Sequence, residues 1–261
     1  MIPRAFITNW KQTAPWISDA QVEQDLVISR ALVDIFSDEL LCNALAFRGG
    51  TALHKLYFAP APRYSEDIDL VQIQPEPIGP VIDRLRDILG FLDGPKIKQK
   101  DRNTTLIFRF ETEVEPVINM RLKIEINCRE HDFIFGPVKK QYSVDSPWFS
   151  GAADLTTFEL EELLATKVRA LYQRRKGRDL FDLWYADRNA DIDWPRVMQA
   201  FHQIMNNDGT PVTDKLLRLN LEEKLEHPDF LTDIGNLLRP EIRFDNSELF
   251  SVMQKLTGEL S

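Results

Sequence analysis

The 261-residue sequence contains only two cysteines and four histidines, and no apolar run approaches the roughly 18 residues that span a bilayer. The cysteines, Cys42 and Cys128, do not form a Cys-x-x-Cys pair, so neither a disulfide framework nor a structural zinc site is expected. The first residues also lack the long apolar core of a signal peptide. These absences favour a cytoplasmic protein with no membrane partner.

The sequence also lacks a loop of the form Gly-x-x-x-x-Gly-Lys-Ser/Thr, which disfavours a P-loop ATPase. The net charge of −9 excludes a surface that is basic throughout. Local basic patches could still contact the phosphate backbone of a nucleic acid. The candidates for such contacts are Lys96, Lys98, Lys100, Arg102, Lys139 and Lys140.

What the sequence does contain is a pair of aspartates, Asp67 and Asp69, at the start of a predicted strand at residues 67–73. Alternate residues of a strand share one face, so both carboxylates project together while the residues between them face an apolar layer. Two carboxylates at this spacing can share one divalent cation. The pattern therefore predicts a metal site on this strand.

Two glycines, Gly49 and Gly50, precede these aspartates and lie between a short predicted strand at 45–47 and a predicted helix at 51–58. Glycine lets the backbone approach a ligand closely, and the start of a helix directs free N–H groups at an anion. A predicted phosphate site therefore precedes the predicted metal site. A nucleoside triphosphate, which carries phosphates and binds a divalent cation, suits both.

A third carboxylate, Glu125, lies on the polar face of a second predicted strand at 120–127. Three acidic groups on neighbouring strands would repel one another unless cations neutralised them, and such triads commonly hold Mg²⁺. Two-metal sites polarise an attacking hydroxyl and the phosphoryl oxygens together. The alternative is that Asp67, Asp69 and Glu125 are solvated residues of a polar sheet face. The glycine pair that precedes them favours the metal site.

A second cluster of charged residues follows, where Lys167 falls on the apolar face of a predicted helix at 158–175. A buried ammonium group is unfavourable without a partner, so Lys167 is expected to meet a carboxylate, a phosphate or carbonyl groups. The alternative is that its stem is buried and its head reaches water. Asp179 and Asp182 share a face of the next predicted helix, and could form salt bridges with Lys167 and Arg178 or face a nucleotide.

The order of predicted elements indicates an α+β fold. After about residue 155 the pattern becomes helical almost throughout, with Gly177 as a helix stop. We expect a mixed β-sheet core flanked by helices in residues 1–152, followed by a helical domain in residues 153–261 that contributes Lys167 and Asp182 to the site. Strands are expected at 45–47, 67–73, 104–110 and 120–127.

Taken together, these segments resemble the AbiEii/AbiGii toxin family of nucleotidyltransferases, within the DNA polymerase β-type nucleotidyltransferase superfamily. The resemblance spans most of the chain. It is carried by Gly49-Gly50-Thr51-Ala52-Leu53, by Arg63 and Ser65 before Asp67-Ile68-Asp69-Leu70, by Lys123-Ile124-Glu125-Ile126-Asn127, and by Leu163-Leu164-Ala165-Thr166-Lys167 leading to Arg178-Asp179-Leu180-Phe181-Asp182-Leu183. Gly50 stands where many relatives have serine, so its phosphate contact would come from the backbone N–H alone.

The resemblance implies transfer of a nucleoside monophosphate from a nucleoside triphosphate (NTP) to an acceptor, with release of pyrophosphate. Members of the family are toxins paired with a separately encoded antitoxin. Some similar proteins modify the 3′ end of tRNA, which makes RNA the expected acceptor. The implied cofactor is Mg²⁺ or Mn²⁺, held by Asp67 and Asp69, with Glu125 helping to activate the acceptor hydroxyl.

The resemblance also implies a role for the helical half of the chain. Lys167 would bind the triphosphate or the charge that develops during transfer, and Asp182 or Asp179 would orient this lysine or the base. The residues with an implied role in nucleotide binding are Gly49, Gly50, Thr51, Arg63, Ser65, Lys123, Arg178 and Asp179.

Two other functions are compatible with the same residues. The acceptor could be a small molecule such as an aminoglycoside, since the chain is acidic overall and cationic antibiotics bind acidic pockets. The protein could also bind a nucleotide or an antitoxin without catalysis. The presence of Asp67, Asp69, Glu125 and Lys167 disfavours this last function, because a site that has lost catalysis need not keep these groups.

Overall fold

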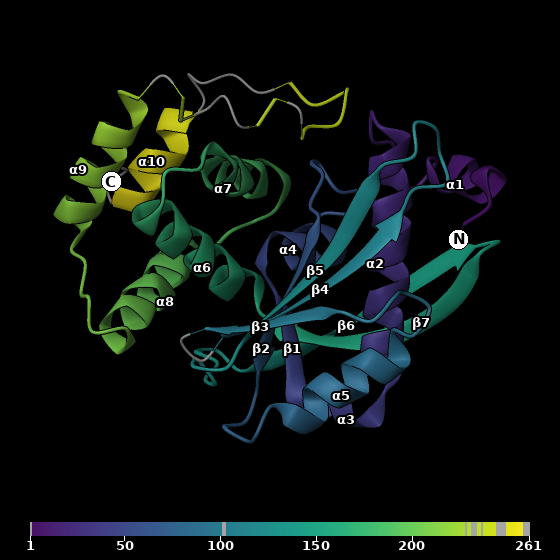
Figure 1. Ribbon diagram of the computed structural model, residues 1–261. Coiled ribbons are helices and arrows are strands. Elements are labelled where there is room, and N and C mark those ends of the chain that lie inside the picture. Colours follow the sequence, from purple (N-terminus) through teal and green to yellow (C-terminus); the bar gives the residue numbers. More distant parts are fainter. Residues whose placement is uncertain are drawn as a thin grey trace. The chain divides into compact units, whose positions relative to one another are not determined.

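The computed structural model describes residues 2–100, 103–227, 229–230, 234–235, 237–243 and 249–257 (Figure 1). Contacts between Cα atoms divide the chain into two compact units, Met1–Phe158 and Glu159–Ser261. The division predicted after residue 152 falls inside strand β7, Phe149–Phe158. All of β7 pairs with strand β6, Pro137–Ser146, so both strands belong to the first unit.

The first unit is built on a seven-stranded sheet with the order β3-β4-β5-β2-β1-β7-β6. The pairs β2–β5 and β1–β7 are parallel, and the other neighbours are antiparallel. The prediction of an α+β fold with a mixed sheet is therefore confirmed. The remaining strands are β1 (Leu45–Arg48), β2 (Asp67–Gln72), β3 (Lys96–Lys100), β4 (Asn103–Glu111) and β5 (Asn119–Asn127).

The long helix α2, Asp19–Ser37, packs against the sheet (Figure 1). The helix begins with a capping box formed by Ser18 and Gln21. In it the backbone N–H of Ser18 donates to Gln21 Oε1 at 3.4 Å. The ring of Phe36, in the last turns of α2, lies 6.4 Å from that of Phe47 on β1. The other helices of this unit are α1 (Arg4–Trp10), α3 (Glu39–Ala44), α4 (Gly49–Leu56) and α5 (Gly79–Ile88).

The two faces of the central strands differ in burial. On one face the side chains of Phe47, Leu70 and Ile126 lie in register and are at most 1% exposed. On the other face Asp67 and Asp69 are half-buried. Since opposed residues of neighbouring strands project to the same side, the apolar face forms the core and the opposite face is polar.

Three strands are not predicted from the sequence pattern: β3, β6 and β7. β3 and β6 are the two edges of the sheet, and an edge strand needs few apolar residues. β3, for example, contains a single apolar residue, Ile97. The helical pattern expected from about residue 155 begins at Leu160, because residues up to Phe158 complete β7.

The second unit is helical, as predicted. α6 ends at Gln173, because Arg174 takes up an extended conformation with φ −135° and ψ 160°. Gly177, expected as a helix stop, instead begins the next helix. The helices that the structure describes here are α6 (Leu160–Gln173), α7 (Gly177–Asn189), α8 (Trp194–Asn207), α9 (Asp214–Leu225) and α10 (Leu249–Thr257).

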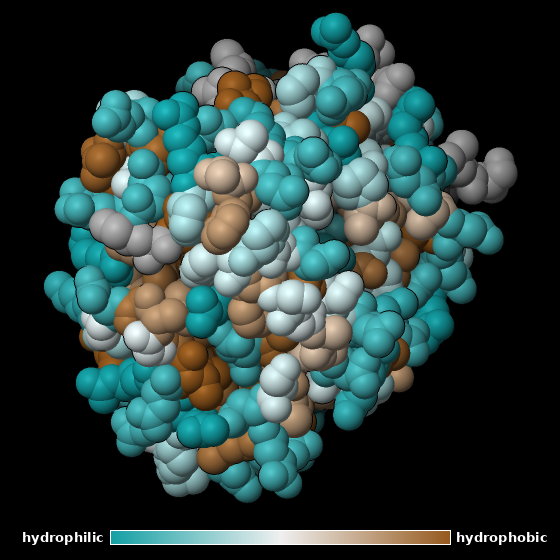
Figure 2. Space-filling view, turned by 90° about the vertical axis from the view of Figure 1, so that its right-hand side faces the viewer, coloured by the Kyte–Doolittle hydropathy of each residue, from teal (hydrophilic) through white to brown (hydrophobic). Residues whose placement is uncertain are grey.

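The surface carries both polar and apolar side chains. Figure 2 shows hydrophobic residues interspersed with hydrophilic ones on the side that it draws. Within the described ranges, no helix is both long and apolar enough to cross a membrane. The exposed large apolar side chains lie on several separate segments, which is ordinary for a protein surface: Ile17, Leu40, Val117, Ile118, Leu216 and Leu219.

Candidate nucleotide and metal site

The glycine turn and the second aspartate are in contact. β1 and β2 pair with Arg48 opposite Asp69, so the turn that follows β1 lies beside the Asp69 carboxylate. Gly49 has φ +81°, and a Cβ atom at this position would lie 2.1 Å from Asp69 Oδ2. The backbone conformation and the close approach both require glycine. The turn and the strand that the sequence singles out separately therefore meet at one place.

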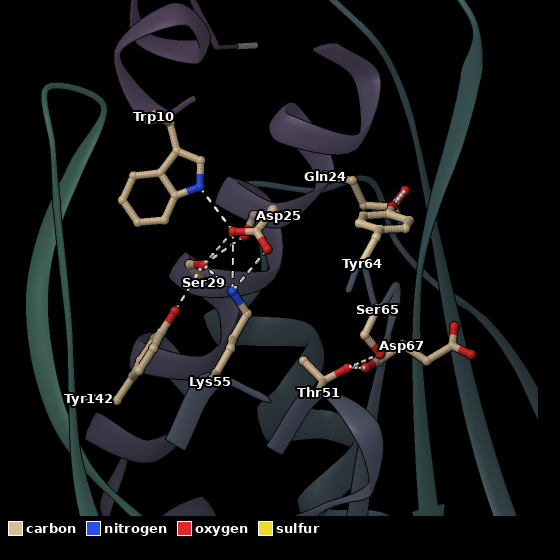
Figure 3. Close-up of polar contacts among 10 residues, drawn as sticks. All are labelled: Trp10, Gln24, Asp25, Ser29, Thr51, Lys55, Tyr64, Ser65, Asp67 and Tyr142. Carbon is tan, nitrogen blue, oxygen red and sulfur yellow. Dashed lines mark hydrogen bonds and ion pairs between the residues drawn. The ribbon is translucent and has the colours of Figure 1, made fainter. Parts of the chain in front are cut away.

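The first turn of α4 is tied to the start of β2 by side-chain hydrogen bonds (Figure 3). The Thr51 hydroxyl donates to the carbonyl oxygen of Asp67 at 2.6 Å and lies 2.7 Å from the Ser65 hydroxyl. Thr51 is buried. The hydroxyls of Thr51 and Ser65 therefore hold the turn against the strand, and the groups of the turn suited to a phosphate are its backbone N–H groups.

Three carboxylates share one face of the sheet, as the alternation in the sequence predicts. β2 and β5 are parallel, with Asp67 opposite Lys123 and Asp69 opposite Glu125. The Lys123 ammonium lies 2.8 Å from Glu125 Oε1 and 3.7 Å from Asp67 Oδ2. Lys123, predicted to bind the nucleotide, therefore lies among the carboxylates.

The charges on this face shift one another's protonation. Burial raises the pKa of Asp67 to about 6, and the negative charges of Asp69, Glu66 and Glu125 add to the shift, whereas Lys123 opposes it. Burial would lower the pKa of Lys123, but the surrounding carboxylates outweigh burial and raise it. Negative charge thus exceeds positive charge around Asp67, and a bound cation would relieve this local excess.

The donor chemistry of the face suits a divalent cation. Carboxylate oxygens are the ligands that Mg²⁺ and Mn²⁺ prefer, and Asp67 and Asp69 present them from one face of one strand. Among the residues that the structure describes, no three acidic, cysteine or histidine side chains already converge as a ligand set. The predicted set of Asp67, Asp69 and Glu125 is thus not arranged as a complete ligand set: Asp67 and Asp69 could hold a cation from one strand, and Glu125 lies opposite Asp69 on the neighbouring strand.

Arg63, predicted to bind the nucleotide, is buried, with 3% of its surface exposed. Its Nη1 donates to the carbonyl oxygen of Tyr64 at 3.0 Å. The side chain therefore shapes the segment that leads into β2 and does not form part of an open surface.

Gln24 of α2 is not among the predicted site residues, yet it supports both strands of the site. Its Nε2 donates to the carbonyl oxygen of Arg121 at 2.9 Å and to that of Glu66 at 3.4 Å. The Tyr64 hydroxyl donates to Gln24 Oε1 at 2.7 Å, which fixes the orientation of the amide (Figure 3). Gln24 therefore links the start of β2 to β5.

The next residue, Asp25, holds α4 (Figure 3). Its two carboxylate oxygens each lie 3.1 Å from Lys55 Nζ, and Trp10 Nε1 donates to Oδ1 at 3.0 Å. Lys55 Nζ and the Tyr142 hydroxyl each donate to Ser29 Oγ at 3.0 Å. Burial would lower the pKa of Lys55, but Asp25 and Tyr142 outweigh burial and raise it. This network joins α1, α2, α4 and β6.

The sequence signal for these two residues is their position among the apolar residues of α2. The helix is buried on nearly all sides, including at Gln24 and Asp25, which are 2% and 5% exposed. Polar side chains within such a helix need partners, because an unpaired polar group in the core is unfavourable. Their presence among Val22, Leu26 and Val27 is the feature that predicts an internal polar network.

In the second unit, Lys167 of α6 forms ion pairs with both predicted partners on α7. Its Nζ lies 2.9 Å from Asp182 Oδ2 and 3.3 Å from Asp179 Oδ1, and all three residues are buried. Arg174 binds both oxygens of Asp179, at 2.7 and 2.9 Å. Burial would raise the pKa of Asp179, but Lys167 and Arg174 outweigh burial and lower it. Lys167 is thus ion-paired and does not reach water, whereas Arg178 lies half-buried in the first turn of α7.

Solved structures share this fold at low sequence identity. MenT4, a nucleotidyltransferase toxin from Mycobacterium tuberculosis H37Rv, is 18% identical with a TM-score of 0.69, over 100% of this chain and 91% of that chain. A Helicobacter pylori protein described as a nucleotidyltransferase is 19% identical with a TM-score of 0.56, over 94% and 97% of the two chains. JHP933, also from Helicobacter pylori, is 19% identical with a TM-score of 0.55, over 93% and 94%.

Comparison with curated protein sequences gives no match. Comparison with protein families matches residues 30–248 to the AbiEii model, described as a nucleotidyl transferase toxin of a type IV toxin–antitoxin system. This segment covers most of the chain and includes every residue of the candidate site except Trp10, Gln24, Asp25 and Ser29. The chain therefore belongs to the AbiEii family of nucleotidyltransferase toxins.

Proposed function

We propose that this nucleotidyltransferase transfers a nucleoside monophosphate from an NTP to a hydroxyl of an RNA acceptor, in the first instance tRNA, with Mg²⁺ or Mn²⁺ as cofactor. The family supports the class of reaction. The observation that carries the proposal is the contact between Gly49 and Asp69. It joins a helix start, which can bind phosphates, to a strand of carboxylates, which can bind a cation.

In this reaction the oxygen of the acceptor hydroxyl forms a bond to the α-phosphorus. The bond between that phosphorus and the oxygen bridging to the β-phosphate breaks, and pyrophosphate leaves with its electron pair. A divalent cation held by Asp67 and Asp69 would supply charge stabilisation at the phosphoryl oxygens and acidify the hydroxyl. We propose that Glu125 accepts the proton of the acceptor hydroxyl. Glu125 lies opposite Asp69 on the neighbouring strand, and its Oε1 is 2.8 Å from Lys123 Nζ.

The glycine turn would hold the triphosphate through the backbone N–H groups at the start of α4. In phosphoryl transfer the protein contributes mainly positioning and electrostatic stabilisation. The hydrogen bonds of Thr51 to the start of β2 keep the turn beside the carboxylates. The bound triphosphate and the carboxylates would therefore keep a fixed distance.

The family resemblance adds a phosphate-binding role for Lys167, with Asp179 or Asp182 as the residue that orients it. Both aspartates contact the lysine, which supports the orienting part of this role. Arg178 and Asp179 are proposed to assist nucleotide binding on the same basis. Variants of Lys167 alone and of Lys167 together with Asp182 would separate its contribution to catalysis from its contribution to stability.

A labelling assay tests the proposed reaction. Purified protein, total RNA and each of the four labelled NTPs are incubated with Mg²⁺ or Mn²⁺, and labelled RNA is resolved by size. We expect one RNA class to be labelled, and Asp69→Ala and Asp69→Asn to abolish the label. Asp93→Asn, which removes an exposed carboxylate elsewhere in the first unit, is the control and should label normally.

Absence of label with every NTP would reject an RNA acceptor. Label on an aminoglycoside in the same assay would then identify the small-molecule alternative. Nucleotide binding by calorimetry, with turnover of neither acceptor, would identify a non-catalytic module.

The toxin role is tested in cells. The family is defined by a toxin–antitoxin system, so we propose a cognate antitoxin as the protein partner. Induced expression should arrest growth, and Asp69→Ala should relieve the arrest. Equal arrest by the Asp69→Ala variant would separate toxicity from nucleotidyl transfer. Sequencing of RNA ends after induction would identify acceptor and added nucleotide together.

A further inference from the structure

The polar face of the sheet extends from the carboxylates to the edge strand β3. Its register is continuous across four strands: Lys96 lies opposite Ile107, Ile107 opposite Lys123, and Lys123 opposite Asp67. Directly opposed residues project from the same face of a sheet. Lys96 therefore lies on the same face as the aspartates, three strands away.

A second row of residues runs beside the first. Lys98 lies opposite Thr105, Thr105 opposite Glu125, and Glu125 opposite Asp69. Neighbouring strands are about 4.8 Å apart, so Lys98 lies roughly 14 Å from Asp69 along this row. Both lysines thus face the same side as the carboxylates at a similar distance.

Two arginines lie on this face beside the first row, on the side away from the second row. Arg109 of β4 and Arg121 of β5 are directly opposite each other. Arg121 precedes Lys123 by two residues, which places it on the same face and about 7 Å along the strand. Like charges directly opposite in an antiparallel pair destabilise the sheet. A bound anion would remove this repulsion.

The four residues Lys96, Lys98, Arg109 and Arg121 are called the basic margin below. All four are exposed. Within the part of the chain that the structure describes, none of the four takes part in an ion pair. Their positive charges are therefore available to a ligand on the same face as the three carboxylates.

We infer that the basic margin binds the sugar–phosphate backbone of an RNA segment whose acceptor hydroxyl reaches the carboxylates. This inference rests on the proposed function and gives its acceptor a binding surface. The net charge of −9 repels a polyanion from most of the protein, so RNA binding requires a local excess of positive charge. The basic margin supplies it one to three strands from Asp67 and Asp69, and it would repel a cationic small-molecule acceptor.

Two double variants test the surface: Lys96→Gln with Lys98→Gln, and Arg109→Gln with Arg121→Gln. The matched control, Lys11→Gln with Arg86→Gln, removes the same charge from two exposed ion pairs of the first unit. Binding of labelled unfractionated tRNA is measured by anisotropy between about 50 and 200 mM salt. The Michaelis constants for RNA and for the NTP are measured in the labelling assay.

Each lost phosphate contact reduces the slope of log affinity against log salt by about 0.7 to 1. Each margin variant removes two positive charges, so the magnitude of its slope should be smaller by about 1.5 to 2 than that of the parent protein. Its Michaelis constant for RNA should rise about tenfold or more, with that for the NTP unchanged. The control should match the parent protein. Unchanged salt slopes and RNA constants in both margin variants would overturn the inference.

Other outcomes are equally informative. RNA binding that depends on the margin, in a protein that labels no RNA, would reject the proposed reaction and leave the surface standing. Labelled RNA with equal constants in parent and variants would reject the surface and leave the reaction standing. Loss of neutralisation by the antitoxin, with RNA binding unchanged, would overturn the inference in favour of a protein interface.

Discussion

Asp25 and Lys55 form a bidentate ion pair, with each carboxylate oxygen 3.1 Å from the ammonium nitrogen and side chains that are 7% and 10% exposed. The pair joins α2 to α4, whose first turn carries the glycines of the candidate site. The residue before it, Gln24, joins α2 to the two strands that carry the carboxylates. Adjacent residues of one helix therefore support both halves of the site.

Lys55→Met should destabilise the first unit strongly, because it leaves the Asp25 carboxylate buried without its cation. Removing one partner of a buried ion pair costs about 3 to 5 kcal/mol. Urea denaturation measures the change. The control is Lys11→Met, which breaks an ion pair whose partners are 43% and 42% exposed and should cost less than about 1 kcal/mol. A similar cost for both variants would contradict a structural role of the Asp25–Lys55 pair.

Gly49→Ala should abolish labelling, because the new Cβ atom would collide with the Asp69 carboxylate. The matched control is Gly136→Ala: Gly136 also has a positive φ, +93°, but a Cβ atom there meets nothing within 4 Å. The backbone strain, about 1 to 2 kcal/mol, is common to both variants. Gly136→Ala should lose only the labelling activity that its lower stability accounts for, whereas Gly49→Ala should lose more. Equal activities of the two alanine variants would show that the contact with Asp69 is unimportant.

Gln24→Glu should remove the hydrogen bonds by which Gln24 links β2 to β5, without a change in side-chain size. A carboxylate cannot donate to the carbonyl oxygens of Arg121 and Glu66, which would lose their partner. Leaving such groups unpaired costs about 1 to 3 kcal/mol. We also expect a higher Mn²⁺ concentration for half-maximal labelling, because the relative position of Asp67 and Glu125 depends on these bonds.

The control for this position is Gln24→Met, which removes the hydrogen bonds but adds no charge. If both variants unfold more readily yet show the metal dependence of the parent protein, Gln24 serves stability alone. A shift in metal dependence in both variants identifies it as a residue that positions the carboxylates.

Lys167→Met should destabilise the second unit by about 3 to 5 kcal/mol, because Asp182 would lose its ammonium partner in the core. The double variant Lys167→Met with Asp182→Leu removes both charges and should recover much of this loss. If Lys167 binds phosphates, the double variant should remain inactive although it is folded. Recovered labelling in the double variant would assign Lys167 a purely structural role.

The stability of the second unit should rise with pH above about 8 because of Lys224. Burial lowers its pKa to about 8, from an ordinary value of 10.5, and its ammonium donates to the carbonyl oxygens of Leu171 and Tyr172. Between these pH values the unfolded chain binds more protons at this lysine than the folded chain does, so unfolding becomes less favourable as pH rises.

The comparison variant is Lys224→Met. Relative to it, the parent protein should gain about 1 to 2 kcal/mol between pH 8 and 10, after allowance for solvent screening. Urea denaturation across this range measures the difference. A difference that is constant with pH would show that Lys224 titrates normally in the folded state.

The local parts of the site follow from the sequence because they depend on short-range geometry. Alternation along β2 places Asp67 and Asp69 on one face, and the same rule orients Glu125 on β5. Helical spacing predicts that Lys167 is buried and needs a carboxylate, a phosphate or carbonyl groups as partner, and the structure shows the carboxylates of Asp179 and Asp182.

The long-range parts do not follow from the sequence. No local pattern states that β2 and β5 are parallel with Asp69 opposite Glu125, or that Gly49 touches Asp69. The burial of Arg63 and its hydrogen bond to the carbonyl oxygen of Tyr64 are also not evident from its position in the motif. Edge strands such as β3 escape prediction because they bury little.

The attachment of both halves of the site to adjacent residues of α2 also has a consequence for amide hydrogen exchange. Opening of α2 around Gln24 and Asp25 would release the start of β2 and the first turn of α4 together. The amides of these two segments, far apart in sequence, should therefore exchange with a common opening free energy. The candidate site would then behave as one cooperative unit, present or absent as a whole.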